Sequence, residues 1–205
     1  MNAKCLLRKA LVTISFSTIG LAAGTASAAD QQVNAGGQLI GASDVSVLGT
    51  LYDVSFVEGT CAAVFSGCDE PSDLAFTNEE SGIAAAQALL DQVFLDTGAG
   101  MFDTRPELTF GCAAFDTLNF CSVLIPSDVS LGAAFGTIAT NSTSPIPDGF
   151  SLLSVPATAD TSQSPTAVWA VFDFSAQQVP EPTTVMLIGL ALAGLGFRRR
   201  KRAAN

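Results

Sequence analysis

The segment Ala167-Val168-Trp169-Ala170-Val171-Phe172-Asp173-Phe174 gives the strongest strand signal in the chain. Every residue except Asp173 is apolar, and β-branched and aromatic side chains, which favour extended backbone, dominate it. A strand that is apolar on both faces is typical of the interior of a sheet. This segment therefore predicts the core of a β-sheet near the end of the folded region.

Further strand candidates lie upstream, separated by Pro and by clusters of Gly, Asp, Asn and Ser. They cover residues 45–48, 51–57, 108–110, 120–125, 133–140 and 150–155. The first two flank Gly49-Thr50 and predict a β-hairpin. In its second strand the alternation of side chains makes Tyr52, Val54 and Phe56 the expected core face.

One amphipathic helix is expected, from about Asn78 to Leu95. Thr77 is a candidate N-cap, with Glu80 at the capping-box spacing. Apolar side chains then recur every three to four residues, and Gly98 and Gly100 stop the pattern. Strands before and after a single helix predict a mainly β or α+β domain, an antiparallel sheet or sandwich-like body with one helix.

Residues 1–29 have the pattern of a secretory signal peptide. A basic start is followed by the apolar residues 10–23 and by the small-x-small sequence Ala26-Ser27-Ala28. We expect cleavage after Ala28 or Ala29, with a retained N-terminal membrane helix as the alternative. Residues 30–178 then form one extracytoplasmic globular domain, as their length suggests.

Charge is divided sharply between the ends and the body. Eight of the nine basic residues lie in the two terminal segments, and only Arg105 lies in the body. Up to Asp173 the body carries eighteen acids against this one arginine, a formal charge of 1 − 18 = −17. Such a body repels nucleic acid, so no nucleic-acid partner is expected. We expect Arg105 to pair with Asp103, Glu107 or a nearby acid.

Four cysteines remain after signal cleavage: Cys61, Cys68, Cys112 and Cys121. An even number in an exported body predicts disulfides. Three connectivities are possible, and we favour the local pairing of Cys61 with Cys68 and of Cys112 with Cys121. The absence of histidine and of any C-x2-C spacing argues against a zinc site, so no metal or cofactor is expected.

The lack of histidine also excludes Ser-His-Asp and Cys-His catalysis, and we assign no catalytic residue. Paired carboxylates could still serve a glycosidase, but eighteen acids offer no obvious pair. Asp69-Glu70-x-x-Asp73 is a possible calcium loop, with a solvated turn as the alternative. Trp169 is expected in the core rather than as a platform for sugar.

The C-terminal residues 179–205 have three parts. Val179-Pro180-Glu181-Pro182 must be extended, because proline fixes φ and lacks an N–H. The uncharged run 183–197, TTVMLIGLALAGLGF, predicts a single transmembrane helix, shorter than the usual span of about 20 residues. The basic tail, residues 198–205, contains Arg198, Arg199, Arg200, Lys201 and Arg202 and should stay cytoplasmic.

This order of motif, apolar run and basic cluster resembles the PEP-CTERM sorting signal of Gram-negative bacteria. The resemblance implies processing near Pro180-Glu181-Pro182 by an exosortase, a membrane cysteine transpeptidase, and an association with exopolysaccharide and biofilm. The same segment is also labelled an ice-binding protein C-terminal domain, and a plain tail anchor is the alternative. The body resembles globular portions of other PEP-CTERM proteins in its segments YDVSFVEGTC and LLDQVF. This resemblance implies no activity.

Together these features predict an exported, non-enzymatic cell-surface or extracellular-matrix protein. Its expected partners are the Sec translocon, signal peptidase, the inner membrane, an exosortase and exopolysaccharide. The alternatives are a carboxylate-dependent carbohydrate-active enzyme and a module that binds polysaccharide, calcium or ice. No regular Thr-x-Thr array supports ice binding.

Overall fold

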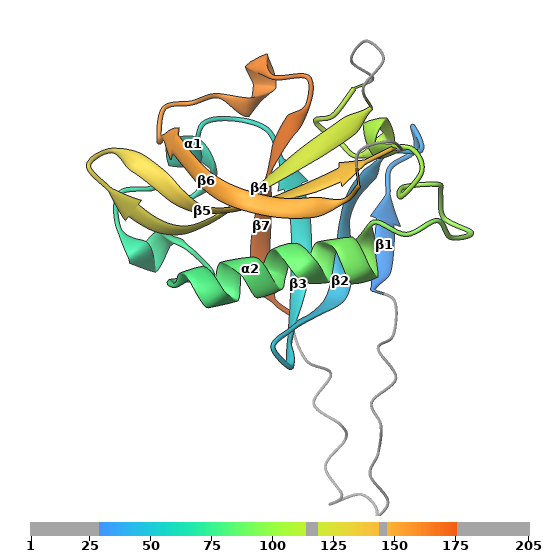
Figure 1. Cartoon of the computed structure of the whole chain (residues 1–205), viewed down its shortest axis with the longest axis horizontal. Helices are drawn as coiled ribbons and strands as arrows, with labels where there is room; N and C mark the ends of the chain where they lie inside the picture. The colour runs from blue at the N-terminus through green and yellow to red at the C-terminus, as the bar shows by residue number, and fades with distance from the viewer. Residues whose placement is uncertain (1–28, 114–118, 144–146, 176–205) are drawn as a thin grey trace, which may run out of the picture.

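The computed structural model describes residues 29–113, 119–143 and 147–175. Seven strands form one mixed sheet in the order β1-β2-β3-β7-β4-β5-β6 (Figure 1). The strands are β1 Asp30–Val33, β2 Leu39–Val47, β3 Thr50–Val57, β4 Phe120–Ser130, β5 Ala133–Ser142, β6 Gly149–Pro156 and β7 Ala167–Phe174. The mainly β prediction is confirmed. The expectation of an antiparallel or sandwich-like body is wrong, because β4 and β7 pair in parallel and join both halves into one sheet.

Strand β7 lies in the middle of this sheet, between β3 and β4. Val168, Ala170 and Phe172 point into the core cluster on one face, and Trp169 belongs to the cluster on the other face. The strand is therefore covered on both sides, as its apolar sequence predicted.

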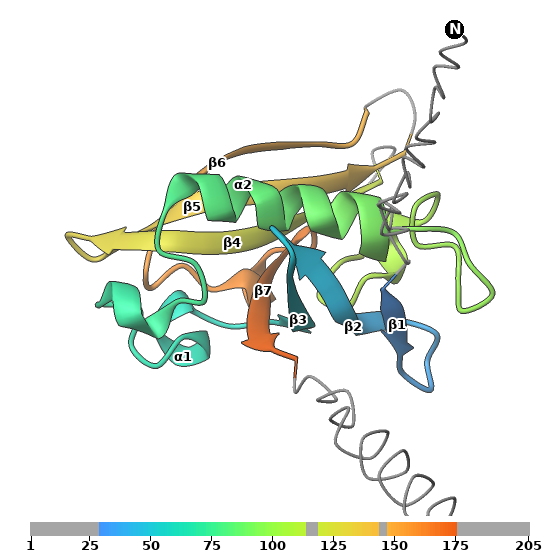
Figure 2. The same cartoon turned by 90° about the horizontal axis from the view of Figure 1, so that it is seen from below.

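The pairing between β4 and β7 is short. It covers Ser122–Leu124 against Ala167–Trp169, and beyond it the two strands separate. Pro126, which lacks an N–H, then lies at a register shift between β4 and β5. As a result β7 runs at a steep angle to β4, β5 and β6, and the sheet is strongly bent (Figures 1 and 2).

The main helix, α2, spans Glu79–Ala88 and continues as a π-helical turn, Leu89–Val93. Its N-cap is Asn78, whose side-chain oxygen accepts from the Ser81 N–H at 2.9 Å. The prediction of Thr77 as the N-cap is therefore wrong by one residue, because the side chain that accepts from the first turn is that of Asn78. The carboxylates of Glu79 and Glu80 lie at the positive end of the helix dipole.

The remaining helical elements are short: α1 Cys61–Val64, η1 Pro71–Asp73, η3 Pro106–Leu108 and η4 Thr161–Gln163. The predicted strand at residues 108–110 is wrong. Pro106 begins a 3-10 turn there, and Thr109 makes only an isolated bridge to Leu39.

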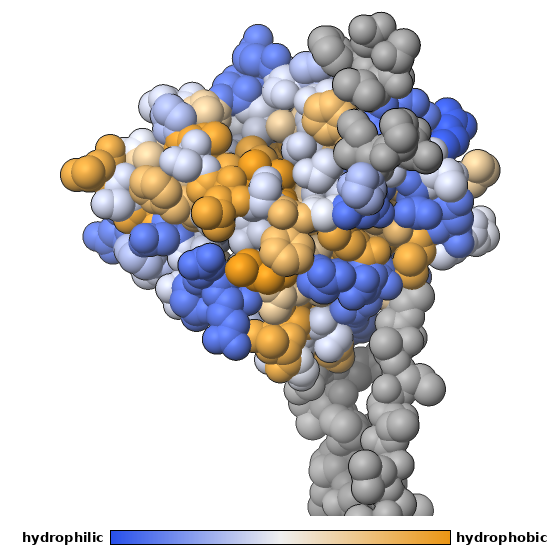
Figure 3. Space-filling view, viewed as in Figure 1, coloured by the Kyte–Doolittle hydropathy of each residue, from blue (hydrophilic) through white to orange (hydrophobic). Residues whose placement is uncertain are grey.

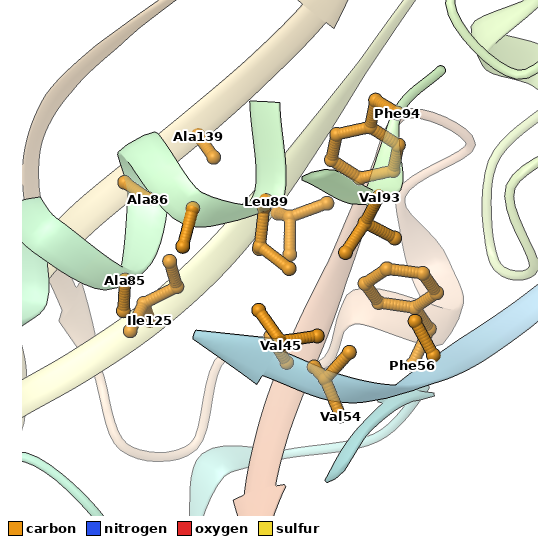
Figure 4. Close-up of a cluster of buried hydrophobic side chains, with 14 of the residues drawn as sticks. Val45, Val54, Phe56, Ala85, Ala86, Leu89, Val93, Phe94, Ile125 and Ala139 are labelled. Carbon is orange, nitrogen blue, oxygen red and sulfur yellow. The ribbon is translucent and has the colours of Figure 1, made fainter. Parts of the chain in front are cut away.

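Helix α2 packs across one face of the sheet, over β2, β4 and β5 (Figure 2). Figure 4 shows the side chains between them, including Val45, Leu89 and Ile125, all at most 1% exposed. Gly82 lets the helix approach closely, because a Cβ there would lie 3.1 Å from Thr137 Oγ1 and 3.2 Å from Ser127 Oγ.

The opposite face is covered by α1 and the loop that follows it. Trp169 is fully buried there, and Phe65 meets its ring edge-on at 5.7 Å. The indole Nε1–H donates to the Gly59 carbonyl at 2.9 Å, so the polar atom of this large side chain is satisfied. Trp169 is a core residue, as predicted.

Candidate functional site

The two disulfides join Cys61 to Cys68 and Cys112 to Cys121, which is the local pairing favoured from the sequence. Their Cα–Cα distances are 5.6 and 5.7 Å. All four cysteines are buried, so the described body offers no free thiol for nucleophilic chemistry.

We expect each disulfide to contribute about 2–3 kcal/mol to the free energy of unfolding, because each closes a short loop. The two bonds lie in different core clusters, so the losses in Cys61→Ala/Cys68→Ala and Cys112→Ala/Cys121→Ala should add. Urea denaturation of both pair variants and of the fourfold variant measures this. A pair variant with wild-type stability would contradict it.

Arg105, the single basic residue of the body, donates from Nε to Glu107 Oε1 at 2.9 Å. The expected partner is thus confirmed. The arginine side chain is 51% exposed, so the pair contributes little to stability.

The acidic loop after Cys68 is held by hydrogen bonds between its own backbone N–H groups and the Asp73 carboxylate. Asp73 Oδ2 accepts from the N–H groups of Asp69 and Glu70, both at 3.3 Å. Within residues 29–113, 119–143 and 147–175, no three His, Cys, Asp or Glu side chains are grouped as a metal site. Asp73 therefore closes a turn over the residues that follow Cys68.

A second acidic group, which the sequence did not single out, forms where two distant loops meet. Asp96 accepts from the N–H groups of Asp103 and Thr104, at 3.0 and 3.1 Å, and from Thr104 Oγ1 at 2.9 Å. Asp148 Oδ1 accepts from the Ser142 N–H at 2.7 Å. Asp103 interacts electrostatically with both of these carboxylates, so the group joins residues far apart in the chain.

The three carboxyl groups differ electrostatically. Burial, followed by the charges of Asp148 and Asp96, raises the pKa of Asp103 above its usual value. The backbone hydrogen bond from Thr104 lowers the pKa of Asp96. Neighbouring carboxyls whose pKa values move apart are the arrangement used for acid–base catalysis, so this is the best candidate in the described body for such chemistry. Asp96 and Asp148 also close their own loops, which is a structural role.

We expect Asp103→Asn to stabilise the protein at neutral pH. The folded-state pKa of Asp103 is above that of the unfolded chain, so its stabilisation is present below pH 3.8 and is lost as pH rises through the folded-state value. Removing the charge should raise Tm at pH 7 by about 2 °C, with no gain at pH 3. Asp30→Asn, at an exposed position in β1, is the control. A fall in Tm at pH 7 would contradict this assignment.

A cavity of about 230 Å³ lies where β4 and β7 separate. Phe65, Phe76 and Phe172 line it together with the carboxylates Asp73 and Asp173. Its volume is below the roughly 300–1,000 Å³ of typical ligand pockets.

The predicted targeting residues fall mostly outside the described part of the chain. The structure does not describe residues 1–28, nor the sorting motif Pro180-Glu181-Pro182, the apolar run 183–197 and the basic residues 198–202. Within the described residues no helix is both long and apolar enough to cross a membrane. Ala29 is buried, and its N–H donates to the Gln92 carbonyl at 3.3 Å. Cleavage after Ala28 would keep this contact, whereas cleavage after Ala29 would remove it.

The end of the fold lies close to the sorting motif in sequence. Strand β7 ends at Phe174, and Ser175 is held by its N–H to the Leu51 carbonyl at 3.2 Å and by its hydroxyl to Asp53 at 2.7 Å. Residues 176–179, four in number, separate Ser175 from Pro180. The described fold thus reaches within five residues of Pro180.

Comparison with known families identifies this C-terminal segment. The model of the PEP-CTERM protein-sorting motif matches residues 178–201, which hold the Pro-Glu-Pro element, the apolar run and most of the basic cluster. No curated protein and no solved structure matches the chain. The motif implies export, a membrane-anchored precursor in a Gram-negative bacterium and an exosortase as processing partner. By this signal the chain is a PEP-CTERM sorting-signal protein, sorted through the exosortase system.

Proposed function

We propose that this protein is a non-enzymatic component of the cell surface or extracellular matrix, delivered there by its C-terminal signal and associated with exopolysaccharide. The observation that carries the proposal is the position of the motif. It begins four residues after Ser175, the last residue of the body that the structure describes, and Ser175 is still hydrogen-bonded to β3. Cutting near Pro180 would release that body whole.

The chemistry of the body supports a role outside the cytoplasm. Its four cysteines form two disulfides, bonds that persist in oxidising compartments. Its formal charge near −17 favours solubility, and its single arginine is already paired with Glu107. An acidic surface of this kind would hold hydrated cations in a polysaccharide matrix without a dedicated site.

The non-enzymatic part of the proposal is supported by the sequence and by the cysteine pairing. The chain contains no histidine, and the described cysteines are all bonded to one another. Asp73, Asp148 and Asp160 each accept a hydrogen bond from a backbone N–H group. Those bonds are typical of residues that close turns.

Cell fractionation tests the destination. We expect the processed body in the outer-membrane, surface or matrix fraction, and the unprocessed chain in the inner membrane. Enzymatic removal of exopolysaccharide should release the body from the matrix fraction. Recovery of the processed body only in the inner membrane would contradict the proposal.

A second candidate function, a carbohydrate-active hydrolase, is favoured by one observation, the raised pKa of Asp103 beside Asp148. Purified body incubated with host exopolysaccharide distinguishes the two functions. We expect no increase in reducing ends. Turnover that Asp103→Asn or Asp148→Asn abolishes, and that Asp30→Asn leaves unchanged, would replace our proposal with the enzymatic one.

A further inference from the structure

Two hairpins of the sheet end in the same unusual pair of residues. Leu48-Gly49 joins β2 to β3 between the paired residues Val47 and Thr50. Leu131-Gly132 joins β4 to β5 in the same way. In both turns the two central φ angles are positive, 49° and 83° in the first and 52° and 77° in the second. These are two-residue turns of the type that normally selects Asn-Gly or Asp-Gly.

Leucine is costly at these positions. A left-handed φ is unfavourable for a side chain with a Cβ, and leucine lacks the polar group with which Asn or Asp offsets that cost. Leu48 is 69% exposed and Leu131 is fully exposed, so neither side chain gains core packing. Residues that break a local rule without benefit to the fold are candidates for a contact with something else.

The two tips point in different directions. Figure 1 shows the β2–β3 turn at the foot of the body, on the side where β7 ends, and the β4–β5 turn at the far left. Figure 3 shows hydrophobic surface at both places. The hydrogen bonds of Ser175 to Leu51 and Asp53 fix the start of the C-terminal segment to strand β3, which leads directly to the first turn.

The length of chain that follows limits how far this end of the body can lie from the membrane. Residues 176–182 separate Ser175 from the apolar run. Fully extended, seven residues span at most about 25 Å. An anchored precursor must therefore hold the β2–β3 end of the body within that distance of the bilayer. Phe174, at the same end, is 73% exposed and stacks on Tyr52.

We infer that the β2–β3 tip, through Leu48, touches the lipid surface of the inner membrane in the anchored precursor. The inference rests on the proposed anchoring of the precursor by its C-terminal segment, and it adds a specific contact and orientation. Asp53 and Asp173 form a cross-strand pair near this end, next to Asp44. These carboxylates keep the contact shallow and favour zwitterionic over anionic lipid.

Tryptophan fluorescence tests the contact. The full mature chain, with its C-terminal segment, is reconstituted as Leu48→Trp and, separately, as Leu131→Trp. Vesicles contain phosphatidylcholine with or without bromine on its acyl chains, which quenches nearby indoles. Trp169 is buried and gives the same background in both variants. We expect brominated lipid to reduce the added emission of Leu48→Trp by more than about half and to leave that of Leu131→Trp unchanged.

The outcomes separate the contact from the anchoring. A chain that does not float with the vesicles overturns the anchored precursor and the contact with it. A chain that floats but shows no quenching for Leu48→Trp overturns the contact alone. Equal quenching at both tips overturns the orientation.

A matched pair of variants gives a second readout in cells. Leu48→Asn and Leu131→Asn relieve the same backbone strain, so both should raise Tm slightly. Only Leu48→Asn should slow processing of the precursor, by roughly two- to ten-fold, because it removes the proposed contact of leucine with lipid. Equal processing of the two variants contradicts the inference. Slower processing of Leu48→Asn without quenching in lipid assigns the tip to a protein partner and also contradicts it.

Discussion

Replacing Trp169 with alanine is expected to lower the free energy of unfolding by about 3–5 kcal/mol, the range for a buried large-to-small change. The side chain is fully buried on the central strand, its ring packs against Phe65, and its Nε1–H reaches Gly59. Since a domain of this size is stable by only about 5–15 kcal/mol, the variant should be partly unfolded at 37 °C. Urea denaturation followed by circular dichroism measures the loss.

Two control variants show whether the loss of unfolding free energy in Trp169→Ala comes from the burial of this side chain. Phe174→Ala removes an aromatic ring from the same strand at a position that is 73% exposed, so it should cost under about 1 kcal/mol. Trp169→Phe keeps most of the volume, and the Gly59 carbonyl retains its bonds from Thr161, so it should fall between the two. Equal losses for Trp169→Ala and Phe174→Ala would contradict the central position of β7.

Replacing both prolines of the sorting motif is expected to reduce the processed fraction by more than about ten-fold, an effect of the size seen when a substrate is mispositioned. Pro180 and Pro182 fix φ and exclude helix around Glu181. Pro180→Ala/Pro182→Ala would let the helical preference of the apolar run extend upstream and withdraw the extended segment from the transpeptidase. Immunoblots of cell fractions measure the ratio of precursor to product.

The control for this experiment is Gln177→Ala, which changes the short connection outside the matched segment, residues 178–201. It should be processed like the wild type. Wild-type processing of the double proline variant would show that Pro180-Glu181-Pro182 is not what the enzyme recognises.

The parts of the fold that were predictable are those set by local sequence. The apolar segment 167–174 became β7, and the helix was found because the 3–4 residue spacing of its apolar side chains is a local feature, although its N-cap was placed one residue too early. The position of β7 was not predictable, because its pairing with β3 and, in parallel, with β4 depends on residues far away in the chain. The same long-range pairing gives one bent, mixed sheet in place of the expected antiparallel or sandwich-like body.

Two strand ends differ from those predicted, because a residue at each could belong either to a strand or to a turn. Leu48 is apolar and was expected at the end of a strand, yet it occupies the first position of the turn. Val47 already pairs with Thr50, and Gly49 supplies the second left-handed position of the turn. Strand β4 was expected to end at Ile125, but it continues through Pro126 to Ser130. The chain tolerates the proline because β7 has already left that edge of β4.

Functional residues could likewise be predicted where they are contiguous in the sequence, and could not where folding brings distant residues together. The sorting signal is contiguous, so its residues could be named directly from the sequence. The cluster of Asp96, Asp103 and Asp148 is assembled only when two loops meet, and among eighteen body acids nothing local distinguished those three. The disulfide pairing was accessible because each bond closes a short loop, with sequence separations of 7 and 9.

The mass of the mature chain tests the sorting of this protein most directly. The chain is purified from its host and from the same host lacking its exosortase, and intact mass spectrometry identifies both termini. We predict that the exosortase-containing host yields a chain without Arg198–Arg202, cut near Pro180-Glu181-Pro182, and that the deletion host retains the whole basic tail. An intact tail in both hosts would contradict sorting through the exosortase system.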